Sequence, residues 1–231
     1  MSETRSPEPN FDTIARAYKW LEYGTLGPLL ERTRGHFLPL LHGRRQALIL
    51  GDGDGRFTAR LLTREQAMHV HAVDTSGVML ELLRRNVARS SPSAAARLTT
   101  AQTDARSVVA SRHTDLIVTH FFLDCLSQTS VSLLVDSLAS SAAPDAAWLV
   151  SDFRIPEGWL RHPAGLYIRL LYFAFRLLTG LRITALPDFA TPLREARFER
   201  IAERHFVFGI LTTELWQRSP QNKTGRQAAA Q

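Results

Sequence analysis

The chain has 231 residues, 45% of them hydrophobic and 22% charged, which fits a soluble globular protein large enough for one α/β domain. A single cysteine, Cys125, excludes an internal disulfide and a cysteine-cluster metal site, and no zinc, iron or calcium ligand pattern is present. The net charge of +6 lies mainly in residues 151–231, with 12 Lys/Arg against 7 Asp/Glu. Because glutamates interrupt these arginines, a solvated face or a surface for an anionic lipid or substrate is favoured over nucleic acid.

The ends of the chain differ from its middle. Residues 1–10 and 219–231 are polar and predict a disordered lead and a disordered tail. Residues 11–44 have helical periodicity, broken near Gly24 and Gly27, and predict an N-terminal helical cap on a domain that spans 11–218.

From Gln46 onward, short apolar runs alternate with amphipathic ones. Strands are predicted at 47–50, 69–74, 97–104, 114–124 and 146–153, and helices at 56–65, 76–90 and 130–142. A long helical pattern at 159–181 and a short one near Pro192 precede two adjacent strands joined at Gly209. Strict alternation implies parallel strands, and the tight last connection implies an antiparallel pair. The sequence therefore predicts an α/β, Rossmann-like, mostly parallel seven-stranded sheet with helices on both faces and a C-terminal antiparallel hairpin.

The junction of the first strand and first helix reads "LILGDGDGRF", with glycines at Gly51, Gly53 and Gly55. Glycines there let the main chain approach a ligand, and the helix behind them offers unpaired N–H groups. The spacing is not G-x-G-x-x-G, and Asp52 and Asp54 would repel a phosphate group. A cationic or zwitterionic ligand suits this turn better, although a bare structural turn is the alternative.

Two further carboxylates end the next two predicted strands. Asp74 ends the second strand, where it can accept both hydroxyls of a ribose. The alternative is an exposed turn aspartate that caps the helix from Ser76 onward. Asp104 ends the third strand, where it can accept a hydrogen bond from an adenine amino group while Ala105 lies against the ring. Three acidic loops at successive strand ends favour a nucleoside ligand.

These motifs resemble the class I S-adenosylmethionine-dependent methyltransferases. "LILGDGDGRF" is similar to the family's first motif, "VDTSGVML" to its ribose-binding motif, "TDAR" to its adenine motif and "DLIVTHFFLDCL" to its fourth-strand motif. The resemblance covers roughly residues 11–216 and implies S-adenosyl-L-methionine as cofactor.

The opening "FDTIARAYKWLE" is similar to the quinone-biosynthesis C-methyltransferase branch, which implies that Tyr18 covers the cofactor. The resemblance of "VDTSGVML" to the ribose-binding motif also implies that Thr75 and Met79 contact the cofactor. One departure is Ile49, where the family commonly has an acid. We hypothesise that Asp52 takes its place and reaches the ammonium group of the cofactor's methionine portion.

Methyl transfer requires an aligned nucleophile, and a base only where the acceptor loses a proton. His120 and Asp124 are the titratable side chains in "THFFLDC", at the end of the fourth strand that faces the methyl group in this fold. Either is a candidate to remove or orient that proton, and His120 also to contact the cofactor. A packed histidine and a helix-capping aspartate are the alternatives.

Residues 159–182 lie where this fold usually inserts a substrate cover. Arg161, Arg169, Tyr172, Arg176 and Thr179 fall in one sector of a helical wheel, and the arginines interrupt the segment too often for it to span a bilayer. A lid helix over an apolar pocket is favoured, and peripheral contact with a membrane interface is the alternative. Both predict a small apolar acceptor, and the missing Asn/Asp-Pro-Pro-aromatic signature disfavours a nucleobase.

The sequence thus predicts a cytoplasmic methyltransferase, or one at the inner face of the membrane, acting on a quinone-, phenol- or lipid-like acceptor. A nicotinamide-dependent oxidoreductase and a non-catalytic cofactor-binding scaffold are the competing interpretations, and the glycine spacing and loop aspartates disfavour the first. The oligomeric state, the acceptor and the methylated atom are not predicted.

Overall fold

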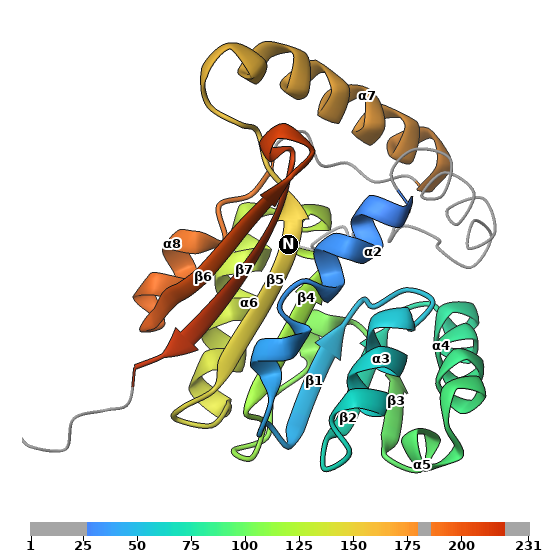
Figure 1. Ribbon diagram of the computed structural model, residues 1–231. Coiled ribbons are helices and arrows are strands. Elements are labelled where there is room, and N and C mark those ends of the chain that lie inside the picture. Colours follow the sequence, from blue (N-terminus) through green and yellow to red (C-terminus); the bar gives the residue numbers. More distant parts are fainter. Residues whose placement is uncertain (1–26, 180–185, 220–231) are drawn as a thin grey trace, which may run out of the picture.

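A computed structural model describes residues 27–179 and 186–219, and the side chains of 171–179 are outside the description. Seven strands form one sheet in the order β3-β2-β1-β4-β5-β7-β6 (Figure 1). The strands are β1 (Gln46–Leu50), β2 (His69–Asp74), β3 (Leu98–Gln102), β4 (Leu116–His120), β5 (Ala147–Phe153), β6 (Phe198–Phe206) and β7 (Leu211–Arg218). β1 to β5 pair in parallel, and β7 pairs antiparallel with both β5 and β6. The predicted sheet is confirmed.

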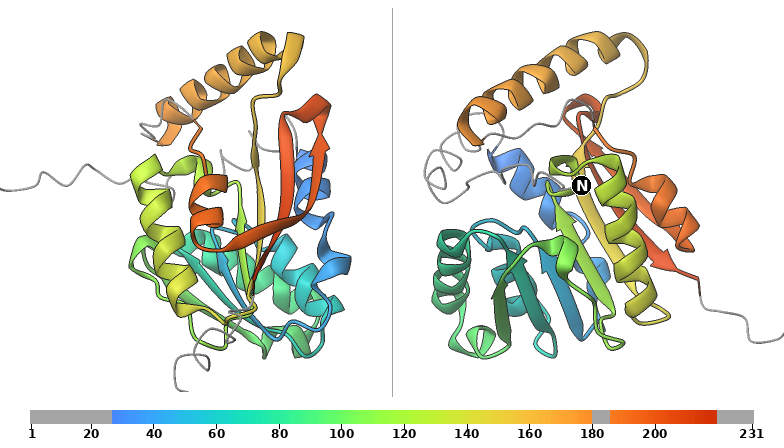
Figure 2. Two further views of the ribbon diagram at one scale, coloured as in Figure 1. Left: turned by 90° about the vertical axis from the view of Figure 1, so that its left-hand side faces the viewer. Right: turned by 180° about the vertical axis from the view of Figure 1, so that it is seen from behind.

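Helices cover both faces of the sheet (Figure 2). They are α2 (Gly27–Gly35), α3 (Arg56–Arg64), α4 (Gly77–Ser90), α5 (Pro92–Ala95), α6 (Gln128–Ser141), α7 (Arg161–Thr179) and α8 (Ala190–Glu195). Five 3-10 turns join them within the described residues: η1 (Leu38–Leu41), η2 (Ala105–Ser107), η3 (Leu123–Cys125), η4 (Gly158–Leu160) and η5 (Val207–Gly209).

The core has two layers, one on each side of the sheet. Leucines of α3 and α4 and side chains of η1 pack with Ile49, Val118 and Leu149 on one face. Leucines of α6 and α8 pack with Leu50, Ile117 and Trp148 on the other. The apolar runs of the central strands follow from this burial, because a parallel strand covered on both faces has no solvent side.

The fourth strand is shorter than the pattern predicts. It ends at His120, because Phe121 has φ 51°, a left-handed conformation that takes the chain out of the strand. The residues that follow form η3, so Asp124 lies on a turn beyond the strand. α7 lies over the end of the sheet toward which β4 and β5 point (Figure 1).

Candidate functional site

The glycine turn lies between β1 and α3, and each of its glycines has positive φ: 67° at Gly51, 64° at Gly53 and 78° at Gly55. A Cβ at Gly51 would lie 2.6 Å from the Phe122 ring, and one at Gly55 would lie 2.4 Å from Leu83 Cγ. A Cβ at Gly53 would meet nothing within 4 Å. The first and third glycines therefore allow close packing, while the second leaves main chain open on its outer side.

Asp52 lies inside the turn and is 4% exposed. Its Oδ2 accepts hydrogen bonds from the Thr58 hydroxyl (2.6 Å) and backbone N–H (3.0 Å), which ties the turn to the first turn of α3. Its Oδ1 is buried and has no hydrogen-bond partner among the described residues. Burial raises the pKa of Asp52 to about 6, against the lowering effects of Thr58 and Arg34.

Asp54 forms an ion pair with Arg56 at 3.0 Å. The Asn86 side chain donates to the Asp54 carbonyl oxygen at 2.8 Å, which holds the turn against α4. The two loop aspartates therefore differ in environment: Asp52 is buried, and Asp54 is paired with an arginine.

The ends of β2 and β3 continue the same edge of the sheet. Asp74 is half-buried and its Oδ1 accepts the Ser76 N–H at 2.9 Å, while Gly51 N–H donates to the Val73 carbonyl at 3.0 Å. The Ser76 hydroxyl accepts from Met79 N–H and caps α4. Thr75 is exposed, whereas Met79 is buried.

Asp104 begins η2 after β3 and forms an ion pair with the Arg106 guanidinium. Its Oδ1 also accepts the Arg106 N–H at 2.9 Å, and Thr103 N–H donates to the Asp74 carbonyl at 3.1 Å. Ala105 is 6% exposed. Sheet order therefore brings the glycine turn, Asp74 and Asp104 together at the carboxyl ends of three adjacent strands.

His120 ends β4 on the face covered by α3. It is 1% exposed, and its ring packs edge-on against Phe57 with centroids 4.4 Å apart. Neither ring nitrogen has a hydrogen-bond partner within residues 27–179 and 186–219. Burial, with the nearby Arg34 charge, lowers the pKa of His120 well below its ordinary value, so the ring is neutral at pH 7.

Asp124 does not pair with His120 in the described structure but lies beside Asp152 at the end of β5. Asp124 N–H donates to Asp152 Oδ2 at 3.2 Å, and Phe153 N–H donates to Asp152 Oδ1 at 2.8 Å. Both aspartates are buried, at 4% and 2% exposed. Side chains alternate along β5, so Asp152 shares the face of Val150 and Trp148, opposite to the face of His120.

The two carboxyl groups influence each other and a neighbouring thiol. Burial, followed by repulsion from Asp124, raises the pKa of Asp152 well above its ordinary value. Burial and the same two carboxyls raise the pKa of the Cys125 thiol. Because two such close groups cannot both ionise readily, the pair holds one proton in preference to two charges.

Two residues of this region were missed in the sequence. Asp152 is an acid at a strand end, the signal that identified Asp74 and Asp104, and that signal applied to "SDF" would have found it. Arg34 of α2 lies with its guanidinium 5.2 Å from the centre of the Phe121 ring and acts electrostatically on both Asp52 and His120. No local pattern marks it, because it reaches the site through the packing of α2.

Other predicted residues lie outside the description: Tyr18 is among residues 1–26, and of the polar sector on residues 159–182 the side chains of Tyr172, Arg176 and Thr179 are not described. Arg161 and Arg169 are exposed on α7.

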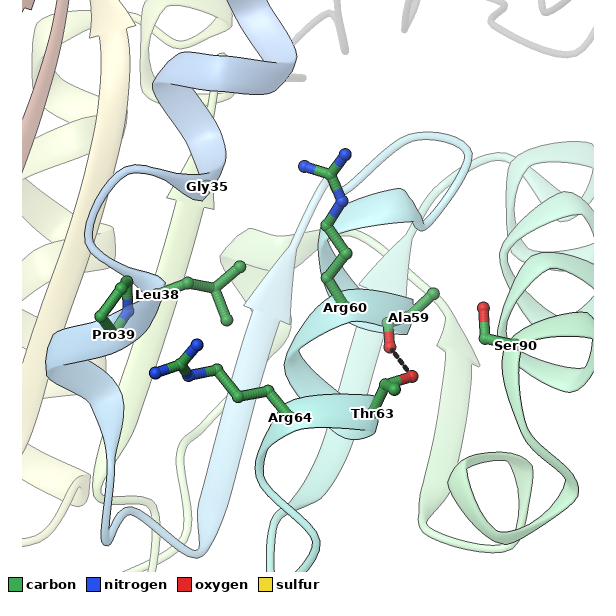
Figure 3. Close-up of a pocket in the computed structure, with 8 residues that line it drawn as sticks. All are labelled: Gly35, Leu38, Pro39, Ala59, Arg60, Thr63, Arg64 and Ser90. Atoms are coloured by element: carbon green, nitrogen blue, oxygen red, sulfur yellow. Dashed lines mark hydrogen bonds between the residues drawn. The ribbon is translucent and has the colours of Figure 1, made fainter.

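The described residues form cavities in at least two places. One, of about 550 Å³, lies between η1 and α3 and is lined by Leu38, Pro39, Arg60 and Arg64 among others (Figure 3). It contains no residue predicted for the site. The other, of about 370 Å³, lies beyond the end of β5, between the segment 186–190 and the strands β6 and β7. Its lining combines Phe153, Ile155 and Phe189 with polar side chains of the hairpin.

Among the described residues, no group of His, Cys, Asp or Glu side chains is arranged to hold a metal ion. No helix in the same part of the chain has the length and apolar character needed to cross a bilayer.

Comparison with known proteins gives a consistent result. Residues 47–145 match a family model described as a methyltransferase domain. No curated protein sequence matches the chain.

Among solved structures, the chain is similar to the mitomycin 7-O-methyltransferase MmcR, with 18% identity over 90% of this chain and 60% of that one, at a TM-score of 0.68. It is similar to an O-methyltransferase family protein from Burkholderia thailandensis, with 15% identity over 90% of this chain and 60% of that one, at a TM-score of 0.67. It is also similar to the N-methyltransferase NodS from Bradyrhizobium japonicum WM9, with 16% identity over 84% of this chain and 98% of that one, at a TM-score of 0.57. The chain therefore shares a fold with these proteins, but it spans less than two thirds of the length of the first two.

Proposed function

We propose that the chain is a class I S-adenosylmethionine-dependent methyltransferase that transfers a methyl group to a small, largely apolar acceptor. The match of residues 47–145 to a family model described as a methyltransferase domain supports this proposal, and so does the fold shared with known methyltransferases. The observation that carries the proposal is the open main chain at Gly53, flanked by carboxylates at the ends of β2 and β3. The family match favours S-adenosyl-L-methionine over a nicotinamide cofactor and agrees with the predicted donor. The quinone-specific branch is not supported beyond the motif resemblance.

We assign the described residues to the parts of the donor as follows. Asp74 at the end of β2 would accept the ribose hydroxyls, and Asp104 with Ala105 at η2 would contact the adenine. The unsatisfied Oδ1 of Asp52 suits the ammonium group of the methionine portion, and Arg34 beside it suits the carboxylate. S-Adenosylmethionine, when bound, supplies a methyl group already activated on a positively charged sulfur.

The chain must then orient the acceptor, exclude water and take up a proton where the acceptor is a hydroxyl. We assign Asp124 as the group that takes up the acceptor's proton. Asp152 is a positioning residue that accepts a hydrogen bond from the Asp124 N–H, and burial followed by repulsion from Asp124 raises the pKa of Asp152. The buried neutral ring of His120 is the second candidate, on the opposite face of the sheet. Phe121 and Phe122, which follow His120, supply apolar surface.

The acceptor class follows from this combination of apolar walls and a carboxyl base. A quinone-, phenol- or lipid-like molecule with an ionisable hydroxyl fits it better than a polar metabolite does. The O-methyltransferase names of two structural relatives agree with transfer to oxygen.

The test is incubation of the full chain with methyl-labelled S-adenosylmethionine and either a lipid and quinone extract or a polar metabolite extract. We expect label in products of the apolar extract. Asp124→Asn should lower kcat by about a hundredfold or more, since a positioned base contributes about that much. Asp136→Asn, an exposed aspartate on α6, is the matched control and should keep full activity.

Two results would contradict the proposal. Label confined to polar products would exclude the apolar acceptor, and an unchanged kcat in Asp124→Asn would exclude that carboxyl as the base. Absence of methyl transfer in both extracts, with intact donor binding, would favour the scaffold interpretation instead.

A further inference from the structure

The outward side of α7 has an unusual composition for a helix at a protein surface. Leu166 is 60% exposed and Leu170 is 59% exposed, whereas Ala164 and Ile168 are 4% and 3% exposed. At about 100° per residue, the two leucines point roughly opposite to the two buried side chains. The apolar side chains of α7 therefore lie on both its inner and its outer side.

Basic side chains share the outer side with the leucines. His162 and Arg169 are exposed and fall within roughly 60° of Leu166 around the helix axis. We call the set His162, Leu166, Arg169 and Leu170 the α7 outer face. It combines apolar and basic groups, which an ordinary solvated helix face keeps apart from each other.

Two aromatic side chains stand at the same end of the molecule. Trp159 on η4 and Phe208 at the tip of the β6–β7 hairpin are each 84% exposed. The two segments are neighbours, since a Cβ on Gly209 would lie 3.2 Å from Pro156 Cβ, and Figures 1 and 2 both place the hairpin tip near the start of α7. Large exposed aromatic and leucine side chains together mark a contact surface.

Charge decides what this surface contacts. From Gly158 to Pro187 the sequence has four arginines (Arg161, Arg169, Arg176 and Arg182) and no aspartate or glutamate. A symmetric contact between two copies would bring these cations together without carboxylates from the same segment to neutralise them. The occupant must therefore offer negative charge and apolar depth at once, and a bilayer with anionic headgroups offers both.

We propose that the α7 outer face, with Trp159 and Phe208, binds the surface of an anionic lipid bilayer. The helix lies along the interface with its leucines among the acyl chains and its basic groups at the headgroups. The inference concerns binding and does not depend on methyl transfer, so it stands or fails separately from the proposed function.

Co-sedimentation of the full chain with phosphatidylcholine vesicles, with and without phosphatidylglycerol, tests the proposal. We expect binding that requires phosphatidylglycerol and weakens as salt is added. The double substitution Leu166→Glu with Leu170→Glu should weaken binding by roughly tenfold or more, because the apolar surface of two leucines is no longer transferred from water into the bilayer. Arg169→Glu should weaken it by at least about fivefold.

Matched substitutions control for charge and folding. Leu133→Glu changes a leucine that is 67% exposed on α6, and Arg89→Glu reverses an exposed charge on α4; both should bind as the unchanged chain does. In a Trp20→Phe background, Trp159 fluorescence should shift to shorter wavelength on phosphatidylglycerol vesicles. The shift should disappear when Trp159→Phe is added, because the remaining Trp148 and Trp216 are buried and report nothing.

Three results would overturn the proposal. They are no binding to phosphatidylglycerol vesicles, binding that survives the double leucine substitution, and a lipid-free dimer that this substitution converts to a monomer. The last result would assign the face to a second copy of the chain.

Discussion

Asp52 has an environment that its local sequence does not indicate. Flanked by two glycines, it is nevertheless buried, with one oxygen bound by Thr58 and the other without a described partner. Its pKa of about 6 means that the folded chain binds this proton more tightly than the unfolded chain, whose carboxyl has a pKa near 4. The associated stability is present below about pH 4 and is lost as pH rises from about 4 to about 6.

Replacing Asp52 by Asn should therefore stabilise the apoprotein at neutral pH. The amide oxygen can still accept the two Thr58 hydrogen bonds, but no buried charge remains. We expect a gain of about 1–3 kcal/mol at pH 7, seen as a rise in Tm of several degrees, and little difference below pH 4. The measurement is Tm against pH for both proteins.

The comparison isolates Asp52 from other titrating groups. His120, whose lowered pKa removes stability as pH falls, titrates in both proteins, so its effect cancels in the difference. For Asp136→Asn, at an exposed site, the difference in Tm from the unchanged chain should be the same at every pH. A constant difference in Tm between Asp52→Asn and the unchanged chain across pH 4–7 would refute the linkage.

At the scale of elements, two glycines of the β1–α3 turn have different roles: Gly55 allows close packing in the fold, and Gly53 leaves room for a ligand. Gly55→Ala places a Cβ 2.4 Å from Leu83 Cγ and 2.7 Å from its Cα, in a backbone conformation that costs about 1 kcal/mol without glycine. We expect it to lower the free energy of unfolding by about 2–4 kcal/mol.

Gly53→Ala is the matched control in the same turn. Its φ is similar, but a Cβ at this position would meet nothing within 4 Å, so the free energy of unfolding should fall by only about 1 kcal/mol. The affinity for S-adenosylhomocysteine should fall by about tenfold or more, because the Cβ occupies the open main chain. Urea unfolding and calorimetry measure the two effects. Equal losses of stability in Gly53→Ala and Gly55→Ala would contradict the prediction that the contact with Leu83 makes Gly55→Ala the more destabilising variant.

The elements that the sequence predicted well are those with local causes. Glycine spacing identified the turn, apolar runs identified the strands, and the helix predicted at 76–90 is α4, which begins one residue later. Its N-cap is Ser76 and not Asp74. The Asp124–Asp152 pair could not be predicted, because it depends on the β4–β5 register and on the turn at Phe121. Arg34 could not be placed either, since its position follows from how α2 packs.

At the scale of the whole molecule, the carboxyl edge of the sheet is where separate loops converge. The turn after β1, Asp74 after β2 and Asp104 after β3 come from well-separated stretches of chain, and only the sheet order makes them neighbours. A ligand that touches all three ties these stretches together in the folded state and not in the unfolded state. Its binding energy is therefore added to the stability of the whole domain.

We accordingly expect S-adenosylhomocysteine, at a concentration of about 100 times its Kd, to stabilise the chain by about 2.7 kcal/mol and to raise Tm by roughly 5–10 °C. Nicotinamide adenine dinucleotide should produce no shift. Asp74→Ala should reduce the shift at the same ligand concentration, because the ribose loses its acceptor. Asp145→Ala, which removes an exposed carboxylate from the amino end of β5, should keep the full shift. If Asp74→Ala and Asp145→Ala respond alike, the nucleoside does not lie along this edge, and the assignment of Asp74 and Asp104 to the donor site is wrong.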